Sequence, residues 1–203
     1  MDEGHDLGVR RRHLLRTGFV LEWITLAWNI AGVIILAALA IASGSIALAG
    51  FGLDSLIEIG ASTVVIWELS GTGEHRQKIA LRLIGAAFIA LAGYLLIQTA
   101  MALTTGHRPD GSIGGIIWTA ITATCMFALA AMKTRTGTEL GNPVLRTEGH
   151  VTMIDGLLAC AVLLGVLLNT ALGWWWADSA ATLLIVYYAI REAINIFRPR
   201  TAV

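Results

Sequence analysis

The sequence predicts an all-α membrane protein, built as a bundle of six transmembrane helices. Of the 203 residues, 56% are hydrophobic and only 14% are charged, whereas a soluble domain carries about 25% charged residues. Six apolar runs are long enough to cross a bilayer, which takes about 20 residues in a helix. Because irregular backbone and open sheet edges are excluded from lipid, a helical bundle is the expected architecture.

The chain divides into two short tails and the transmembrane domain between them. Residues 1–16 form a polar, basic N-terminal tail, and residues 198–203 form a short tail after which no C-terminal soluble domain is expected. Turn residues such as Ser43-Gly44 and Gly173 separate the apolar runs. The transmembrane domain covers residues 17–197, with spans at about 17–42, 45–69, 79–104, 112–132, 144–171 and 175–197.

The distribution of Lys and Arg predicts that both termini are cytoplasmic. An even number of spans puts both termini on one side, and thirteen of the fourteen Lys and Arg, Lys133 included, are assigned to that side. The other side receives only Arg108. Because positive residues accumulate in cytoplasmic loops, we expect an integral, multi-pass protein of a bacterial-type plasma membrane, with the lipid bilayer as its surroundings.

Several function classes are disfavoured by the sequence. The net charge is zero, so bulk charge gives no indication of a nucleic-acid partner. No nucleophile–base pair, phosphate-binding loop or cofactor fingerprint is recognisable. We therefore expect neither an enzyme nor a catalytic cofactor.

Two acids in the second span suggest a binding function. Asp54 and Glu58 lie near its midpoint, four residues apart and so on one helix face. Each ionisable group at membrane depth costs roughly 2.5–3.5 kcal/mol on insertion scales. They either pair with a basic residue elsewhere in the bundle or bind a cation. The cation site is favoured because no basic residue is expected at the same depth.

A third acid, Asp155, is expected at the depth of this pair. The fifth span runs antiparallel to the second, and Asp155 lies near its middle. Three carboxylates from neighbouring helices offer the hard oxygen ligands that divalent cations prefer. As bare anions they would be unstable, so either a cation or protons must be present. Asp54, Glu58 and Asp155 are therefore the predicted metal ligands, and cation/proton exchange is the simplest chemistry for such a site.

Four further polar residues are candidates for an additional ligand or for the ion pathway. Glu148 and Thr152 lie on the same helix side as Asp155, and Glu148 is expected to line the entrance. His150 lies about 140° away from Asp155 around the helix, so it is either an interfacial histidine or a ligand. Asn29, in the first span, either makes an interhelical hydrogen bond or takes part in the pathway.

Three segments resemble the membrane domain of the cation diffusion facilitator (cation efflux) family. SGSIALAGFGLDSLIEIGAS is similar to its second helix, NPVLRTEGHVTMIDGLLACAVLLG to its fifth, and WWADSAATLLIVYYAIREAI to its sixth. The resemblance implies proton-coupled export of a divalent metal such as manganese, iron, cobalt or zinc, usually by a homodimer. It also implies a four-ligand site that includes Asp54, Glu58 and Asp155.

The chain departs from this family pattern at the fourth ligand position, which is Val151. Thr152, Glu148, His150, Asn29 or water could replace that ligand, or the protein could supply only three ligands. Zinc favours nitrogen and sulfur ligands, whereas carboxylates and water suit harder ions. We therefore expect an ion harder than zinc. A membrane-embedded interaction or assembly protein and a cation channel stay open as alternatives.

Overall fold

The computed structural model describes residues 3–71, 74–106 and 110–197, and within these ranges it contains helices and no strand. Each of the six helices is long and apolar enough to cross a membrane, which confirms the predicted fold class. The expectations for residues 1–2 and for the tail at 198–203 lie outside the described residues. The helices are α1 (Glu3–Ser43), α2 (Ile46–Leu69), α3 (Glu74–Thr105), α4 (Ile113–Leu140), α5 (Pro143–Leu172) and α6 (Trp176–Phe197).

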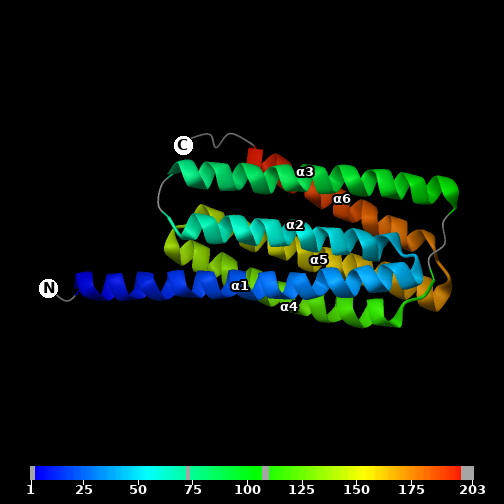
Figure 1. The fold of residues 1–203 in the computed structure, drawn as a ribbon, viewed down its shortest axis with the longest axis horizontal. Coiled ribbons are helices and arrows are strands. Elements are labelled where there is room, and N and C mark those ends of the chain that lie inside the picture. Colours follow the sequence, from blue (N-terminus) through cyan, green and yellow to red (C-terminus); the bar gives the residue numbers. More distant parts are fainter. Residues whose placement is uncertain (1–2, 72–73, 107–109, 198–203) are drawn as a thin grey trace.

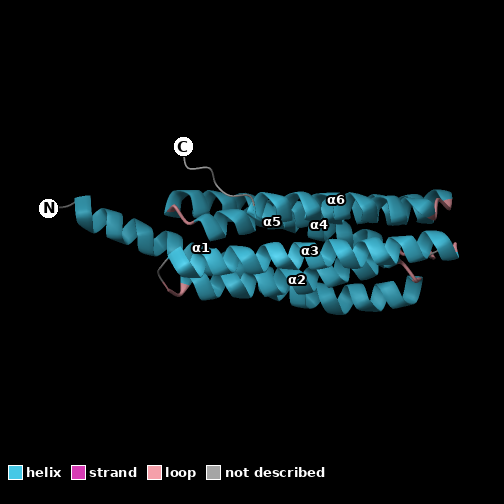
Figure 2. Ribbon diagram, turned by 90° about the horizontal axis from the view of Figure 1, so that it is seen from above, coloured by secondary structure: helices cyan, strands magenta, loops and turns pink. Residues whose placement is uncertain are grey.

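The helices run along one common axis and are joined by short loops (Figures 1 and 2). The beginning of α1 projects beyond the other helices, and α6 finishes toward the same end of the bundle (Figure 1). Helix α5 packs against α2, α4 and α6, and α1 packs against α2 and α4. Polar side chains from α1, α2, α4 and α5 can therefore meet inside the bundle.

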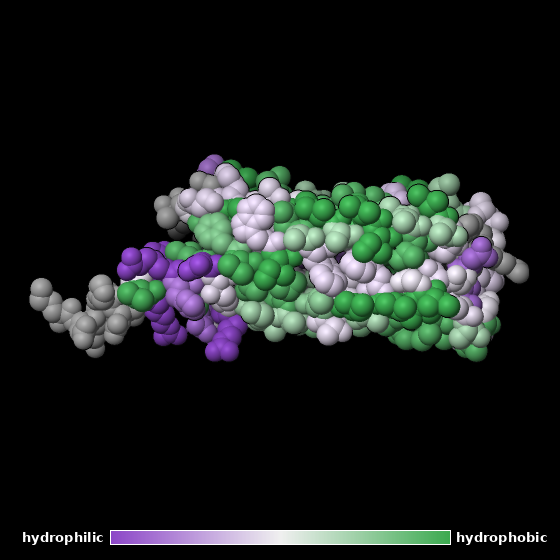
Figure 3. Space-filling model, turned by 60° about the horizontal axis from the view of Figure 1, so that its bottom comes forward, coloured by the Kyte–Doolittle hydropathy of each residue, from purple (hydrophilic) through white to green (hydrophobic). Residues whose placement is uncertain are grey.

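The surface fits a bilayer environment. Apolar surface covers the length of the bundle, and strongly hydrophilic surface gathers where α1 begins (Figure 3). Large apolar side chains such as Ile34, Ile41 and Ile97 are exposed along the helices, where lipid can cover them.

The turn between α4 and α5 is specified by three consecutive residues. Gly141 ends α4 in the left-handed conformation, with φ of 64°, which glycine adopts without steric cost. The side-chain oxygen of Asn142 accepts hydrogen bonds from the backbone N–H groups of Val144 and Leu145, both 2.9 Å long. Pro143 follows at the first helical position, where its missing N–H costs nothing. This turn returns the chain directly onto α4.

Helix α4 extends further than the expected fourth span. That span ended at residue 132, but the helix continues to Leu140. Its last turns pack against the start of α5 because glycines lie at the contact. A Cβ added at Gly137 would lie 2.5 Å from the backbone nitrogen of Arg146, and one added at Gly149 would lie 2.6 Å from the backbone nitrogen of Thr134. The extension carries Lys133 into the α4–α5 interface.

We expect Gly149→Ala to destabilise the protein by about 1–3 kcal/mol, because the added methyl group overlaps backbone that cannot move aside without separating α4 from α5. Thermal melting of the detergent-solubilised protein measures the effect. Gly93→Ala is the matched control, since nothing lies within 4 Å of a Cβ built at Gly93. Equal melting temperatures for the two variants would show that the helices do not need this close approach.

Candidate cation site

Asp54 and Glu58 lie one helical turn apart on the inward face of α2. Both side chains are buried, with relative exposures of 6% and 3%. The neighbouring inward positions, Phe51 and Ala61, are also buried. The structure therefore holds two carboxyl groups in the apolar interior of the bundle, where a charged group needs a partner.

Asp155 of α5 lies beside Asp54. The two carboxyl groups are close enough to interact directly, as expected for matching depths on antiparallel helices. Asp155 is 4% exposed, and among the described residues no N–H or O–H donor is bonded to either of its carboxylate oxygens. Two adjoining buried carboxyls can share a proton or bind a cation, because two neighbouring bare anions repel each other.

Lys133 corrects the expectation that this residue is a cytoplasmic surface charge. Its side chain is completely buried, and its Nζ lies 3.1 Å from Glu22 Oε2 of α1 and 3.1 Å from Glu148 Oε1 of α5. Both carboxylates are also completely buried. The expectation that the bundle interior holds no basic residue near the acids is therefore wrong. Lys133 is a basic residue in that interior, and it is paired with two buried acids. Twelve Lys and Arg, not thirteen, are left to support the predicted orientation.

Thr152 connects Lys133 to Glu58. Lys133 Nζ donates a hydrogen bond of 3.2 Å to Thr152 Oγ1, and Thr152 Oγ1 donates one of 2.8 Å to Glu58 Oε1. Thr152 was predicted to lie on the side of Asp155, and the structure turns its hydroxyl toward α2. We call Glu22, Lys133, Glu148, Thr152 and Glu58 the Lys133 network.

The other candidate residues take separate positions. Glu148 belongs to the Lys133 network, and the His150 side chain is exposed on the outside of α5. Asn29 is buried, and its side-chain nitrogen donates to the carbonyl oxygen of Thr25 in its own helix, at 3.0 Å. Val151 belongs to the hydrophobic core and has no ligating atom. The structure thus brings Glu148 and Thr152 toward the acids, and leaves His150 outside.

The predicted ligands are not gathered around one point. Among the described residues, no three His, Cys, Asp or Glu side chains converge closely enough to hold a metal ion. Asp54 and Asp155 adjoin each other, while Glu58 is bound by Thr152. The arrangement therefore offers a two-carboxyl centre with a third carboxyl engaged nearby.

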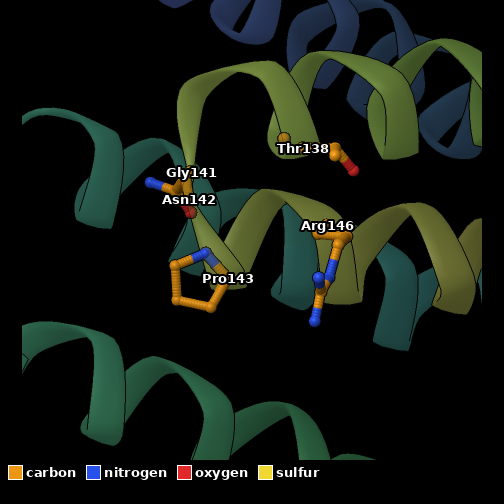
Figure 4. Close-up of a pocket in the computed structure, with 6 residues that line it drawn as sticks. Thr138, Gly141, Asn142, Pro143 and Arg146 are labelled. Atoms are coloured by element: carbon orange, nitrogen blue, oxygen red, sulfur yellow. The ribbon is translucent and has the colours of Figure 1, made fainter.

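A surface pocket at the α4–α5 turn is distinct from these carboxyls. It has a volume of about 350 Å³, and Arg146 is the one charged side chain among its described lining residues (Figure 4). Since no acid lines it, it does not offer the ligands that a divalent cation prefers. Its lining residues are Gly137, Thr138, Gly141, Asn142, Pro143 and Arg146.

Comparison with known proteins agrees with a membrane-spanning bundle. The cation efflux transmembrane domain matches residues 23–202. The chain is also similar to Transmembrane protein 163 of Xenopus laevis, at 21% identity over 150 residues. That match covers 71% of this chain and 53% of the relative, so the chain spans about half the length of the curated protein that it matches.

Proposed function

The chain belongs to the cation efflux family, and from this premise we propose that it is a secondary transporter that exports a divalent metal cation in exchange for protons. Family membership and the six apolar helices make it an integral, multi-pass membrane protein of a cation-transporting family. The cargo, the coupling to protons and the residues that bind the cargo are our proposals.

One observation carries the assignment of the site. Asp155 is buried, neither of its oxygens accepts a hydrogen bond from a donor of the described residues, and its carboxyl adjoins that of Asp54. A buried carboxylate without a donor is expensive, and no apolar packing role requires one. A bound cation, or a proton when the cation leaves, satisfies the pair. This exchange is the chemical basis of proton-coupled transport, and Glu58 is the third ligand that we propose.

The Lys133 network bears on the alternative of an assembly protein, in which the acids would hold a partner helix. Glu22 and Glu148 have their basic partner within the chain, and that partner is Lys133. Asp155 is not bound by it. The Asp155 carboxyl, which accepts no hydrogen bond from the described residues, therefore favours an ion as its partner over a second protein.

We propose a homodimer with cytoplasmic termini in a bacterial-type plasma membrane. The family resemblance supports the dimer, and the positive residues support the orientation. Arg10, Arg11 and Arg12 are exposed near the start of α1, at the hydrophilic end of the molecule (Figure 3). Such residues accumulate on the cytoplasmic side of membrane proteins.

We expect purified protein in liposomes to move Mn²⁺ when a pH gradient is imposed, and to stop when an ionophore collapses the gradient. Val151 leaves the site with oxygen ligands, so Mn²⁺ should be transported with a higher kcat/KM than Zn²⁺. A metal-sensitive dye enclosed in the vesicles measures both ions. Transport that is indifferent to the gradient would indicate a channel, and a clear preference for Zn²⁺ would refute the harder-ion assignment.

A further inference from the structure

The hydrogen bonds of the Lys133 network have a fixed direction. The lysine ammonium has three donors and no acceptor, and it contacts Glu22, Glu148 and Thr152. The Thr152 oxygen can only accept from Lys133, so its single hydroxyl proton is left to point elsewhere. That proton is directed at Glu58 Oε1, 2.8 Å away. The ion pairs therefore fix the orientation of Lys133, and Lys133 fixes that of Thr152.

This hydrogen bond and a three-carboxylate cation site compete for Glu58. Asp54 and Asp155 already adjoin each other, but no three acidic side chains of the described residues converge as they stand. Glu58 is the missing member, and its Oε1 is bound to Thr152. While Thr152 holds Oε1, Glu58 can offer a shared ion only its other oxygen. To contribute both oxygens, the Glu58 carboxylate has to turn from Thr152 toward Asp54 and Asp155.

We propose that Lys133 and Thr152 are positioning residues that hold Glu58 Oε1 away from Asp54 and Asp155, so that Glu58 offers both of its oxygens to the cation site only when its bond to Thr152 breaks. This inference rests on the proposed function, since it concerns the same site. It adds that the ion meets a two-carboxyl centre first and a three-carboxyl centre second. The hydrogen bond from Thr152 to Glu58 lies in the buried interior of the bundle, where it is electrostatically stronger than in water.

The first test is Thr152→Val, which removes the hydroxyl, keeps the side-chain shape and leaves the ion pairs of Lys133 in place. With Glu58 released, we expect Mn²⁺ to bind about two- to tenfold more tightly, the range that one net hydrogen bond contributes. Isothermal titration of the purified protein with Mn²⁺ gives the dissociation constant. Thr152→Ser is the matched control, because it retains a hydroxyl and should restore wild-type affinity.

The second test removes Lys133 without leaving unpaired charges, in the triple variant Glu22→Gln, Lys133→Met, Glu148→Gln. Without Lys133, the Thr152 hydroxyl is free to turn to a backbone carbonyl of its own helix, so Thr152 should no longer hold Glu58, and a further loss of its hydroxyl should matter little. The triple variant also removes one net negative charge, which by itself weakens cation binding. Adding Thr152→Val to the triple variant should change the Mn²⁺ affinity by less than Thr152→Val changes it in the wild type, because the effects of residues in one hydrogen-bond network are not additive.

The outcomes separate this inference from the proposed function. If Asp155→Asn loses Mn²⁺ binding while Thr152→Val binds like or more weakly than the wild type, the site stands and the positioning role is wrong. If the wild type and Asp155→Asn give the same Mn²⁺ titration, the proposed site fails, and this inference fails with it. Tighter binding in Thr152→Val, reversed in Thr152→Ser, supports both.

Discussion

Replacing Asp155 with asparagine is expected to abolish cation transport while the protein keeps its fold. The substitution preserves size and removes a carboxylate that accepts no hydrogen bond from the part of the chain that the structure describes. The new amide group can donate to Asp54, so the folded state loses no contact and sheds a buried charge. Mutating a residue that only holds a metal ligand in place costs about 10–100-fold in metal affinity or activity. Because Asp155 is itself a proposed ligand, transport should fall by at least 100-fold.

Glu68→Gln is the matched control for Asp155→Asn. Glu68 is also a buried acid, at the end of α2, and its Oε2 accepts a hydrogen bond of 3.0 Å from Asn142. A glutamine side-chain oxygen can accept the same bond. Uptake of Mn²⁺ into liposomes should therefore continue in this variant, and neither variant should melt at a lower temperature than the wild type. Comparable uptake by Asp155→Asn and the wild type would rule out the proposed site.

The fold and the depth of the acids could be predicted from the sequence because few backbone structures are stable in lipid. Backbone groups in a bilayer must be satisfied within a helix, so long apolar runs determine the architecture. Antiparallel neighbours then place residues at the middle of each span at the same depth. This reasoning put Asp155 at the level of Asp54, and the structure brings their carboxyls together.

The burial of Lys133 could not be obtained from hydropathy, because the apolar run ends just before it. Counting charges in loops assigned it to the surface. A helical signal was nevertheless present: Met126, Leu129 and Ala130 form a buried stripe, and Lys133 continues it three and four residues later, as expected for one face of a helix. Gly137 extends the stripe by a further turn.

The hydrogen bond between Thr152 and Glu58 depends on rotamers and on helix packing. Spacing alone placed Thr152 three residues from Asp155, on a similar side of α5. The contacts of Thr152 depend on how the helices pack. Helix α4 approaches α5 closely at Gly149, and the Thr152 hydroxyl lies between Lys133 of α4 and Glu58 of α2. No pattern within one helix carries that information.

Replacing Lys133 with methionine is expected to cause the largest loss of stability in the bundle. It removes the ammonium from between Glu22 and Glu148, whose second oxygens, Glu22 Oε1 and Glu148 Oε2, have no hydrogen-bond partner among the described residues. Removing one partner of a buried ion pair costs about 3–5 kcal/mol, because the remaining charge is left without compensation. The two acids must then stay charged without a partner or take up protons, and either change raises the free energy of the folded state.

Arg135→Met separates this effect from the loss of any cation in α4. Arg135 lies two residues further along the helix and pairs with Glu139, at 3.0 Å, but its side chain is 83% exposed. Exposed pairs of this spacing contribute only about 0.3–0.5 kcal/mol, so thermal melting in detergent should be nearly unchanged.

Glu22→Gln and Glu148→Gln, added to Lys133→Met, should restore most of the stability, since replacing a whole buried ion-pair cluster by neutral groups of similar volume is often harmless. Equal melting temperatures for Lys133→Met and Arg135→Met would show that the two acids do not depend on Lys133. A triple variant as unstable as Lys133→Met would attribute the loss to packing of the lysine side chain, not to charge.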